Sequence, residues 1–350
     1  MSTARKGLCS GCGTCSTACP LSIIEFEDDL PTIGNDLCLS DLYESCGVCC
    51  FVCPRESGPV EAPNDAFQAR QADEDSSSQF LMGYAQDPEI RQLGQAGGLI
   101  TATLVAGLET GFLDAVTVVQ GQKDLEAKIV SATTRDEVLA GAGTQYTRIS
   151  AVEGAWSLRQ RHGKNFAFTG TPCMIQGMRK LQEIGFHESV QSCILIGVFC
   201  SKSFRADPLR RAIRDLTGRS AENVSRIGIK KKVSIKFTDG DKHVVKLKDI
   251  LGAAQSSCQF CDDFLAESAD LSVGEMGAPP GQSVVIVRTQ RGQDLLTNAQ
   301  EAGQLVLEPC SDKIVQILKK WAVKKRTEAR ESKVPLEGAK ESITRIEAKT

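Results

Sequence analysis

The sequence predicts two parts of different character, a small cysteine-rich α+β module at residues 1–56 and a mixed α/β domain at residues 80–310. Nine of the fifteen cysteines lie before residue 57, in a stretch too short to build a sizeable apolar core. After residue 80, helix-like and strand-like segments alternate, which is typical of α/β proteins. Residues 57–79, rich in proline, serine and charged residues, are expected to form a linker, and residues 311–350 a charged helical tail.

The first cysteine run is the most specific feature of the module. Cys9, Cys12, Cys15 and Cys19 are separated by two, two and three residues and followed by Pro20. This spacing is the bacterial-ferredoxin run that holds iron–sulfur clusters. A disulfide knot or a zinc ribbon is the alternative, but zinc sites use pairs of ligands with longer spacers. Because the fourth cysteine of such a run binds a second cluster, a second run is expected.

The second run is incomplete. Cys46, Cys49 and Cys53 precede Pro54, but Tyr43 stands where another cysteine is expected. The nearest upstream thiol, that of Cys38, is predicted to replace it, and Cys50 is then spare. The alternative is a degraded site that holds a three-iron cluster or none. The predicted ligand sets are Cys9, Cys12, Cys15 and Cys53 for one cluster, and Cys19, Cys38, Cys46 and Cys49 for the other.

Composition narrows the function classes. A chain of 350 residues with 41% hydrophobic residues can bury a core, and its formal net charge of −3 argues against a nucleic-acid partner. Fifteen cysteines without a secretory signal peptide indicate a reducing cytoplasm and metal ligation. No apolar run reaches the roughly 18 residues needed to span a membrane. We therefore expect a cytoplasmic protein that reaches a membrane only through a partner.

Periodicity predicts the elements of the larger domain. Apolar residues at helical spacing predict helices at residues 100–111, 151–162, 174–185 and 313–333. Apolar and β-branched runs predict strands at residues 115–120, 165–169, 192–199 and 283–288. Residues 224–248 predict a hairpin that turns at Asp239 and Gly240. On the last helix the expected apolar side carries Ile314, Ile317, Leu318, Trp321 and Val323.

A third set of cysteines lies within the larger domain. Cys173 and Cys200 each follow a predicted strand, and Cys258 and Cys261 form a Cys-x-x-Cys pair. Strand ends are where open α/β sheets place their sites, so these thiols are candidates for one more cluster. The alternative is that they are small buried hydrophobic residues, as we expect for Cys193.

From Met82 to about Lys325 the chain resembles the beta-subunit family of coenzyme F₄₂₀-reducing hydrogenases and dehydrogenases. The resemblance is carried by several short segments together: Gln95–Ala102, Ala142–Thr147, Gly170–Lys180, Gly197–Cys200, Cys258–Phe264 and Ala269–Gly274. It implies a domain that binds FAD and one [4Fe–4S] cluster and exchanges hydride with the deazaflavin F₄₂₀. The cluster ligands would be Cys173, Cys200, Cys258 and Cys261.

Three glycine- or proline-bearing turns are then the expected FAD contacts. The first turn, at Gln95–Thr101, leads into a helix, and the amino end of a helix suits a pyrophosphate. The alternative is a plain glycine turn. The F₄₂₀ tail is anionic, so a basic mouth is expected from Arg179, Lys180, Lys202 and the run Lys230–Lys232, unless that run is a solvated edge-strand feature. The expected cofactor-binding residues are Gln95, Gly97, Gly98, Thr101, Gly143, Thr144, Tyr146, Thr171, Pro172 and Lys202.

With its ferredoxin-like module, the chain is similar to the electron-input subunits of F₄₂₀H₂ dehydrogenases, which serve membrane-bound, complex-I-like quinone or methanophenazine reductases. The expected route runs from F₄₂₀H₂ to FAD, then through the clusters to such a complex or to a ferredoxin, with no acid–base residue required. The alternatives are a beta-type subunit serving a hydrogenase, formate dehydrogenase, heterodisulfide reductase or sulfite reductase, and a non-catalytic relay. The basic helix Lys319–Lys333 would dock a partner or anionic lipid, or simply face solvent.

Overall fold

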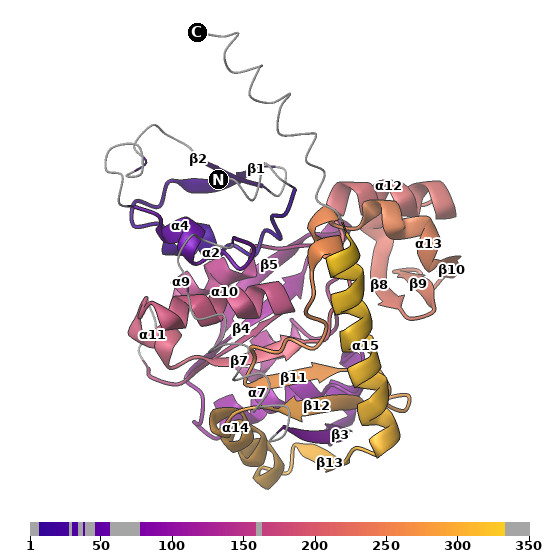
Figure 1. Ribbon diagram of the computed structural model, residues 1–350. Helices are drawn as coiled ribbons and strands as arrows, with labels where there is room; N and C mark the ends of the chain where they lie inside the picture. The colour runs from indigo at the N-terminus through magenta and orange to yellow at the C-terminus, as the bar shows by residue number, and fades with distance from the viewer. Residues whose placement is uncertain are drawn as a thin grey trace.

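The fold is built around one eight-stranded sheet with strand order β13-β3-β12-β11-β7-β6-β4-β5 (Figure 1). The computed structural model describes residues 7–27, 30–33, 38, 46–56, 78–158 and 163–332. The strands of this sheet are β3 (Gln79–Ala85), β4 (Ala115–Gly121), β5 (Ala127–Ala132), β6 (Phe166–Gly170), β7 (Ile194–Val198), β11 (Leu271–Gly274), β12 (Ser283–Val287) and β13 (Leu305–Pro309).

The four central strands β11, β7, β6 and β4 run parallel, and antiparallel strands flank them on both sides. Gly170 at the end of β6 pairs with Gly197 near the end of β7. The carboxyl ends of these two strands therefore lie at one edge of the sheet. The segments that follow them, which begin at Thr171 and Phe199, start side by side.

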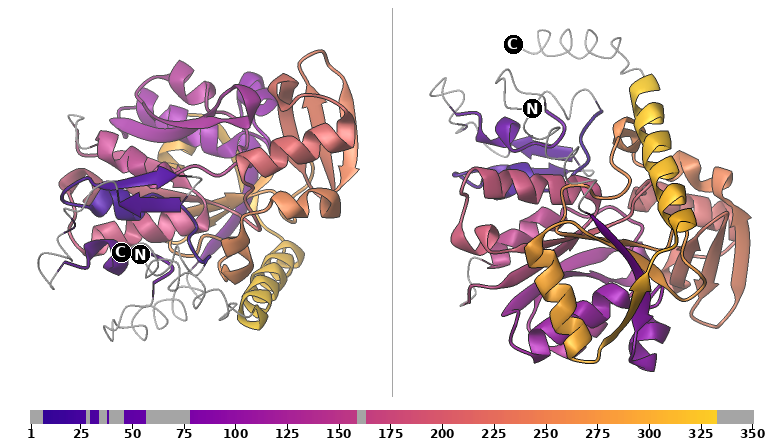
Figure 2. Two further views of the ribbon diagram at one scale, coloured as in Figure 1. Left: turned by 90° about the horizontal axis from the view of Figure 1, so that it is seen from above. Right: turned by 60° about the horizontal axis from the view of Figure 1, so that its bottom comes forward.

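Helices cover both faces of the sheet (Figure 2). One face packs against α7 (Leu99–Glu109), α8 (Arg135–Leu139) and α14 (Gln290–Glu301). The other packs against α9 (Gly154–Leu158), α10 (Pro172–Glu183) and α15 (Asp312–Glu331). The shorter helices are α2 (Thr14–Ala18), α4 (Val48–Phe51), α6 (Pro88–Leu93), α11 (Glu188–Gln191) and α13 (Leu247–Ile250), and α12 (Ala206–Thr217) lies at the edge of the molecule.

Local sequence explains where these helices begin and end. Pro172 is the first residue of α10, where its missing N–H is not needed and its fixed φ suits the helix. Thr134 and Glu137 form a capping box at the start of α8. Gly111, with φ +73°, follows the last turn of α7 in the left-handed conformation that glycine adopts readily.

A second, three-stranded sheet corrects the predicted hairpin. It consists of β8 (Val224–Ile229), β9 (Lys232–Phe237) and β10 (Lys242–Lys246), with β9 in the centre. The turn at Asp239 and Gly240 is confirmed, but a further turn at Lys230 and Lys231 was missed, since the run of lysines hides it. The lysine run is therefore a turn leading into a central strand and not part of an edge strand.

The cysteine-rich module packs directly on the larger domain. It contains α2, α4 and a hairpin of β1 (Ile24–Glu27) and β2 (Leu30–Ile33). A Cβ atom on Gly177 of α10 would overlap the Thr14 side chain, so the two helices approach closely because this residue is glycine. The Cys12 carbonyl accepts from the Val152 amide at 3.0 Å. The module and the domain thus share one packed interface.

The helix α15 packs one side against the core. Ile314, Leu318, Ala322 and Lys325 form its buried stripe, at intervals of four, four and three residues. Val323, which the periodicity assigned to the apolar side, is 57% exposed. Among the described residues, no helix combines the length and the apolar character required to cross a membrane.

The predicted strands at 115–120, 165–169, 192–199 and 283–288 are confirmed, as are the helices at 100–111, 174–185 and 313–333 up to residue 331. The helix predicted at 151–162 begins with a 3₁₀ turn and reaches Leu158 as α9, and residues 159–162 lie outside the described part. So do residues 57–77 of the predicted linker, and Gln79 already belongs to β3. The sequence-based assignment missed β3, β5, β11, β13, α12 and α14.

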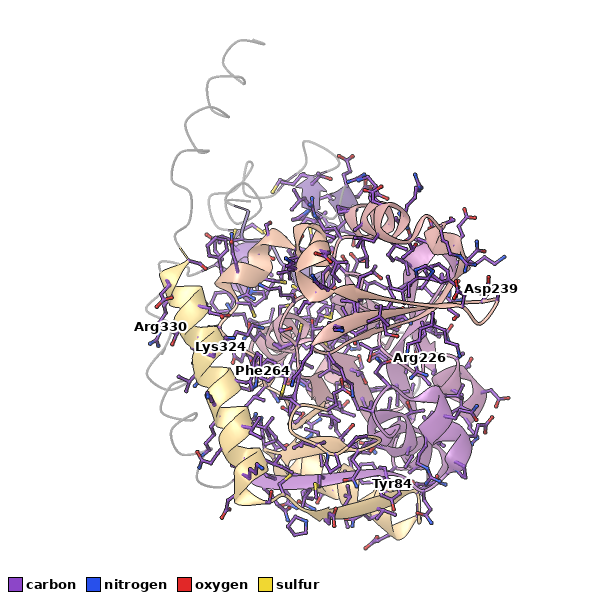
Figure 3. All side chains as sticks on the ribbon, turned by 90° about the vertical axis from the view of Figure 1, so that its right-hand side faces the viewer. Tyr84, Arg226, Asp239, Phe264, Lys324 and Arg330 are labelled. Carbon is purple, nitrogen blue, oxygen red and sulfur yellow. The ribbon has the colours of Figure 1, made fainter. Side chains whose placement is uncertain are left out.

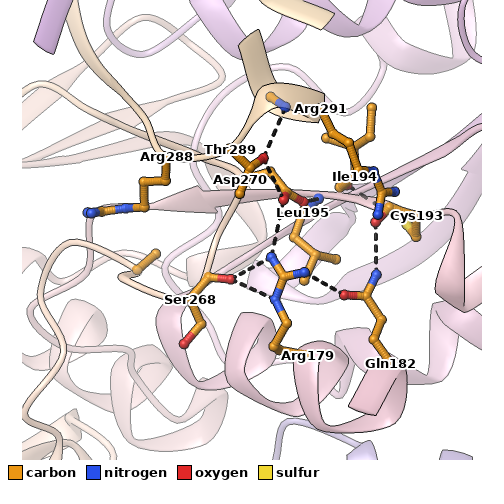
Figure 4. A network of polar contacts seen from close by, with 12 residues as sticks. Arg179, Gln182, Cys193, Ile194, Leu195, Ser268, Asp270, Arg288, Thr289 and Arg291 are labelled. Atoms are coloured by element: carbon orange, nitrogen blue, oxygen red, sulfur yellow. Dashed lines mark hydrogen bonds and ion pairs between the residues drawn. The ribbon is translucent and has the colours of Figure 1, made fainter. Parts of the chain in front are cut away.

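A buried polar network centred on Asp270 holds the middle of the sheet (Figure 4). The Asp270 carboxylate accepts from the Leu195 amide at 2.7 Å and from the Thr289 hydroxyl at 2.8 Å. Arg179 of α10 donates to the same carboxylate at 3.2 Å and to the Ser268 carbonyl at 2.9 Å. One carboxylate therefore ties β7, α10 and the start of β11 together.

We predict that Asp270→Asn lowers the free energy of unfolding by about 2 kcal/mol, because the amide leaves a buried donor or acceptor unmatched. Thermal unfolding of the anaerobically purified protein should show a transition several degrees lower than that of the wild type. Asp294→Asn, the same change on the exposed face of α14, is the control. Equal unfolding temperatures in the two variants would contradict the role given to Asp270.

Candidate functional site

The first cysteine run folds around a cavity. Its lining includes the four thiols predicted for one cluster, together with those of Cys49 and Cys50. Cys19, Cys38 and Cys46, the other members of the predicted second set, do not line this cavity. Most residues between Cys38 and Cys46 lie outside the described part, so the second ligand set stays a prediction. The four first-set residues at the cavity are Cys9, Cys12, Cys15 and Cys53.

Gly11 shapes the loop that carries these thiols. It has φ +60°, and its amide donates to the Cys9 Sγ at 3.3 Å, an N–H to sulfur contact of the kind expected around a cluster. A Cβ atom at this position would coincide with the guanidinium of Arg148, a buried residue of the larger domain. Nothing in the sequence around Arg148 identifies it, since its place follows only from the packing of the two parts.

The grouped thiols repel one another when ionised. Burial raises the pKa of Cys15, and the neighbouring thiolates of Cys12, Cys9 and Cys53 raise it further. Burial also raises the pKa of Cys9, while the Gly11 amide and Arg148 oppose that rise. A polycationic iron–sulfur core would offset this repulsion, so the donor set fits a cluster.

The third set of cysteines comes together at the sheet edge described above. Cys173 follows β6, Cys200 follows β7, and Cys258 and Cys261 lie in and just after a 3₁₀ turn at Ser256–Phe260. Burial raises the pKa of Cys200; Lys325 opposes the rise, and the thiolates of Cys258, Cys173 and Cys261 add to it. Cys200 therefore lies within electrostatic reach of the other three predicted ligands.

Polar groups surround these thiols. The Ser203 amide donates to the Cys258 Sγ at 3.5 Å, and the Thr171 hydroxyl lies 3.3 Å from the Cys173 Sγ. The Nε of Arg55 is buried without a hydrogen-bond partner beside this set, and an inorganic sulfide would provide one. Among the described residues, no three His, Cys, Asp or Glu side chains converge tightly enough to hold a single metal ion.

The first and third sets are neighbours. Burial raises the pKa of Cys173 to about 11, and the next largest cause is the thiolate of Cys12. Gln255 contacts segments that carry both sets. Its side chain donates to the Cys9 carbonyl at 3.1 Å, and its backbone N–H donates to the Ser203 carbonyl at 2.9 Å. The module and the domain thus place their thiols on either side of one interface.

A cleft of about 720 Å³ opens between the large sheet and the three-stranded sheet. This volume lies in the range of small-molecule and cofactor sites. A Cβ on Gly143 would meet only the Leu93 carbonyl, at 3.8 Å, so the backbone here leaves room for a ligand. Four of the expected cofactor-binding residues line the cleft, and they are Gln95, Gly143, Thr144 and Tyr146.

The other expected contacts lie elsewhere. A Cβ on Gly97 would overlap the Gly281 carbonyl, and one on Gly98 the Ile90 carbonyl, so both glycines permit close backbone packing at the start of α7. Thr101 is buried within α7. Among the lining residues of the cleft these three do not appear, and neither do Thr171, Pro172 and the exposed Lys202.

Tyr146 links the cleft to the third cysteine set. Its hydroxyl accepts from the Ile229 amide at 3.2 Å, and burial raises its pKa. Its carbonyl accepts from the Phe204 amide at 2.9 Å, and Phe204 directly follows Ser203, the residue that donates to Cys258. This connection therefore joins the floor of the cleft to the thiols.

The cations of the cleft are not the ones the sequence suggested. Arg179 serves the Asp270 network, and Lys180 donates to the Cys53 carbonyl at 3.0 Å, which ties α10 to the module. Lys230 pairs with Glu275 at 3.0 Å. The basic residues that line the cleft are Arg226 of β8, labelled in Figure 3, and Lys236 of β9. The sequence pattern of β8 and β9 alone does not distinguish Arg226 and Lys236 from basic residues that face solvent.

Comparison with known proteins gives two adjoining family matches, both to the coenzyme F₄₂₀ hydrogenase/dehydrogenase beta subunit. Residues 80–155 match the amino-terminal part of that subunit, and residues 163–313 match its carboxyl-terminal part. The coenzyme F₄₂₀ hydrogenase subunit beta of Methanococcus voltae is 34% identical over 235 residues, covering 65% of this chain and 83% of that protein.

Two relatives match more of the chain. The coenzyme F₄₂₀-dependent sulfite reductase of Methanocaldococcus jannaschii is 31% identical over 304 residues, covering 83% of this chain and 46% of that protein. One subunit of the F₄₂₀H₂ dehydrogenase of Methanosarcina mazei is 25% identical over 321 residues, covering 87% of this chain and 86% of that protein.

A solved structure shares the fold. It is a chain of the F₄₂₀-reducing [NiFe] hydrogenase complex from Methanosarcina barkeri, with a TM-score of 0.67 and 28% identity. The alignment covers 72% of this chain and 90% of that chain. The mixed sheet of the larger domain is therefore a fold seen in a known redox complex.

We predict that Gly11→Ala removes about four irons per chain, one cluster's worth, because the new methyl group would displace Arg148 and the loop that carries the first-set thiols. Iron analysis after anaerobic purification measures the loss. Gly7→Ala is the matched control, since Gly7 also has a positive φ, +69°, but has nothing near its would-be Cβ. Full iron content in Gly11→Ala would show that the loop tolerates the change and would contradict the account.

Proposed function

The chain belongs to the coenzyme F₄₂₀ hydrogenase/dehydrogenase beta-subunit family, and we propose that it oxidises F₄₂₀H₂ and passes single electrons through iron–sulfur clusters to a redox partner. FAD, when bound, would supply the conversion of a two-electron hydride donor into single-electron transfers, which is what clusters require. The protein itself would hold these groups in the order of electron transfer, exclude water from them and set the charge around each.

Three ligand sets would hold the clusters. In the third set, beside the carboxyl ends of β6 and β7, Cys200 lies within electrostatic reach of the other three thiols, and the first set lines its own cavity. The second set depends on Cys38. The proposed ligands are Cys173, Cys200, Cys258 and Cys261 for the third set, Cys9, Cys12, Cys15 and Cys53 for the first, and Cys19, Cys38, Cys46 and Cys49 for the second.

The cleft beside the third set would hold FAD and admit F₄₂₀H₂. The open backbone at Gly143 and Thr144 would allow close approach of a cofactor, and Gln95 offers a side-chain amide. Arg226 donates to the Gly94 carbonyl at 2.5 Å and to the Gln95 side chain at 3.2 Å, so it fixes one wall. Lys236, the other basic residue of the lining, would face the anionic tail of F₄₂₀.

The observation that carries this proposal is the connection between the cleft and both cysteine sets. From Tyr146 in the cleft, hydrogen bonds run through Phe204 and Ser203 to Cys258, and Gln255 continues them to Cys9. A hydride-accepting site next to this connection would deliver electrons to the third set first and to the module second. The order of the groups in space thus supports the proposed order of transfer.

For the partner, we propose a membrane-associated, complex-I-like dehydrogenase complex, with the chain bound on its cytoplasmic face. The nearly full-length match to the F₄₂₀H₂ dehydrogenase subunit supports this choice, because it spans 87% of the present chain, more than the domain alone. A soluble ferredoxin is the other acceptor that suits single-electron delivery.

A second candidate is a sulfite-reductase-type role. The match to the F₄₂₀-dependent sulfite reductase is closer in identity, at 31%, and spans 83% of this chain. The present chain covers only 46% of that protein, so in this case the reducing centre would be supplied by a separate subunit. The two candidates share the F₄₂₀H₂-oxidising half and differ in the acceptor.

The direct test is to purify the chain anaerobically, quantify iron and flavin, and mix it with F₄₂₀H₂ while following flavin and cluster absorbance. We expect about twelve irons, one FAD and rapid bleaching. About eight irons with bleaching would remove the Cys38 set from the assignment. A cofactor-reconstituted protein with no flavin and no bleaching would contradict the enzyme and leave a non-catalytic relay.

A cleft variant sharpens this test. Lys236→Met should raise the KM for F₄₂₀H₂ about tenfold and leave kcat nearly unchanged, because the tail binds equally in ground and transition states. Lys248→Met, on the exposed surface of α13 and outside the cleft, is the control and should change neither constant. An unchanged KM in Lys236→Met would place the tail elsewhere.

A further inference from the structure

Two cations from distant parts of the sequence lie beside the third cysteine set. Arg55 comes from the end of the cysteine-rich module, and Lys325 comes from the last helix, α15. Neither residue belongs to the strands and turns that carry the thiols. Lys325 is buried, and Arg55 is partly buried with its Nε shielded from solvent.

Lys325 is held in a specific position. Its ammonium group donates to the Cys200 carbonyl at 2.5 Å and to the Asp263 carbonyl at 2.8 Å, and the residue is only 8% exposed. These carbonyls lie on two separate segments, one after β7 and one after the Cys-x-x-Cys pair. The lysine thus bridges the segments that carry Cys200 and Cys261.

The surrounding helix explains why a lysine is buried here. Trp321, one turn earlier on α15, stacks on Phe264 with ring centroids 5.9 Å apart, and Phe264 is labelled beside this helix in Figure 3. Ala322 and Leu318 continue the same buried stripe. Apolar packing thus fixes the helix against the core and delivers the ammonium group to the thiols.

Lys325 lies among groups of opposite charge. Its ammonium group is close to Cys200, Cys261 and the Asp263 carboxylate. Two other carboxylates lie on this segment, the exposed Asp262 and Glu267, and Arg326 pairs with Glu267 on the surface side of α15. Arg326 therefore compensates Glu267, while Lys325 faces the thiols.

We propose that Lys325 is a positioning residue that fixes the Cys200 and Asp263 segments and, through its buried ammonium group, raises the reduction potential of the cluster held by the third set. The inference rests on the proposed function, because it requires a cluster at these cysteines. Its consequence is that the third cluster becomes the better electron acceptor next to the cleft. Arg55 adds charge of the same sign from the module side.

The test is an EPR-monitored redox titration of the whole protein, in which the third-set signal is identified as the one altered by Cys258→Ser. Lys325→Gln keeps a hydrogen-bond donor without the charge and should lower the midpoint potential. At a fixed potential near the midpoint, the ratio of reduced to oxidised cluster should fall at least tenfold, which is 59 mV for one electron. Lys325→Arg, which keeps the charge, should stay within threefold of the wild type.

Lys324→Gln is the matched control, because Lys324 is the neighbouring lysine on the exposed side, paired with Glu328 at 3.8 Å. It should leave the potential unchanged. A wild-type potential in Lys325→Gln with full iron content would overturn the inference. If Lys325→Gln loses the cluster, Lys325→Arg must retain it, and loss in both would also overturn the inference. A wild-type protein without the third-set signal would instead overturn the proposed function.

Discussion

The structure depends on the cost of burying many thiolates together. Burial and each neighbouring thiolate raise the pKa of a cysteine in these sets, as Cys15 and Cys200 show, so several thiols can be ionised at once only with compensating positive charge. The chain supplies part of it through Arg148, Arg55 and Lys325, and an iron–sulfur core would supply the rest. All three cations lie close to the contacts between the module, the sheet and α15. Metal binding and the packing of these parts are therefore coupled.

The parallel centre of the large sheet makes this arrangement achievable. Because β6 and β7 are adjacent and parallel, Cys173 and Cys200 start from one edge, and the Asp270 network keeps β7 and β11 in place beneath them. The same edge receives the module through Cys12 and Gln255 and faces the cleft through Phe204. A short hydrogen-bonded connection then joins all three sites. This geometry favours ordered electron transfer over a set of independent binding sites.

Much of the site could be predicted from local sequence, and its connections could not. Cysteine spacing carries its own information, so it identified the ligand candidates of the first set. For the third set, the positions of Cys173 and Cys200 after predicted strands left two interpretations open, and the family resemblance favoured a cluster. The glycine turn at Gly143 was likewise recognisable, since few residues tolerate its backbone. Arg55, Arg148, Gln255 and Lys325 were missed because their roles arise from packing between segments far apart in the chain. For Lys325 the sequence did contain a signal. Ile314, Leu318, Ala322 and Lys325 follow one another at intervals of four, four and three residues, which places all four on one face of the helix. The lysine run at 230–232 misled the prediction, because charge alone does not distinguish a turn from an edge strand.

The central claim is that the first and third sets hold neighbouring clusters on one electron path. The most direct test is the EPR spectrum of the fully reduced protein, because two paramagnetic clusters on either side of the interface between the module and the larger domain, where Cys12 is close enough to Cys173 to affect its pKa, should interact magnetically. The account predicts split or broadened signals that become simple when the first-set cluster is removed. A spectrum equal to the sum of isolated, non-interacting clusters would contradict it.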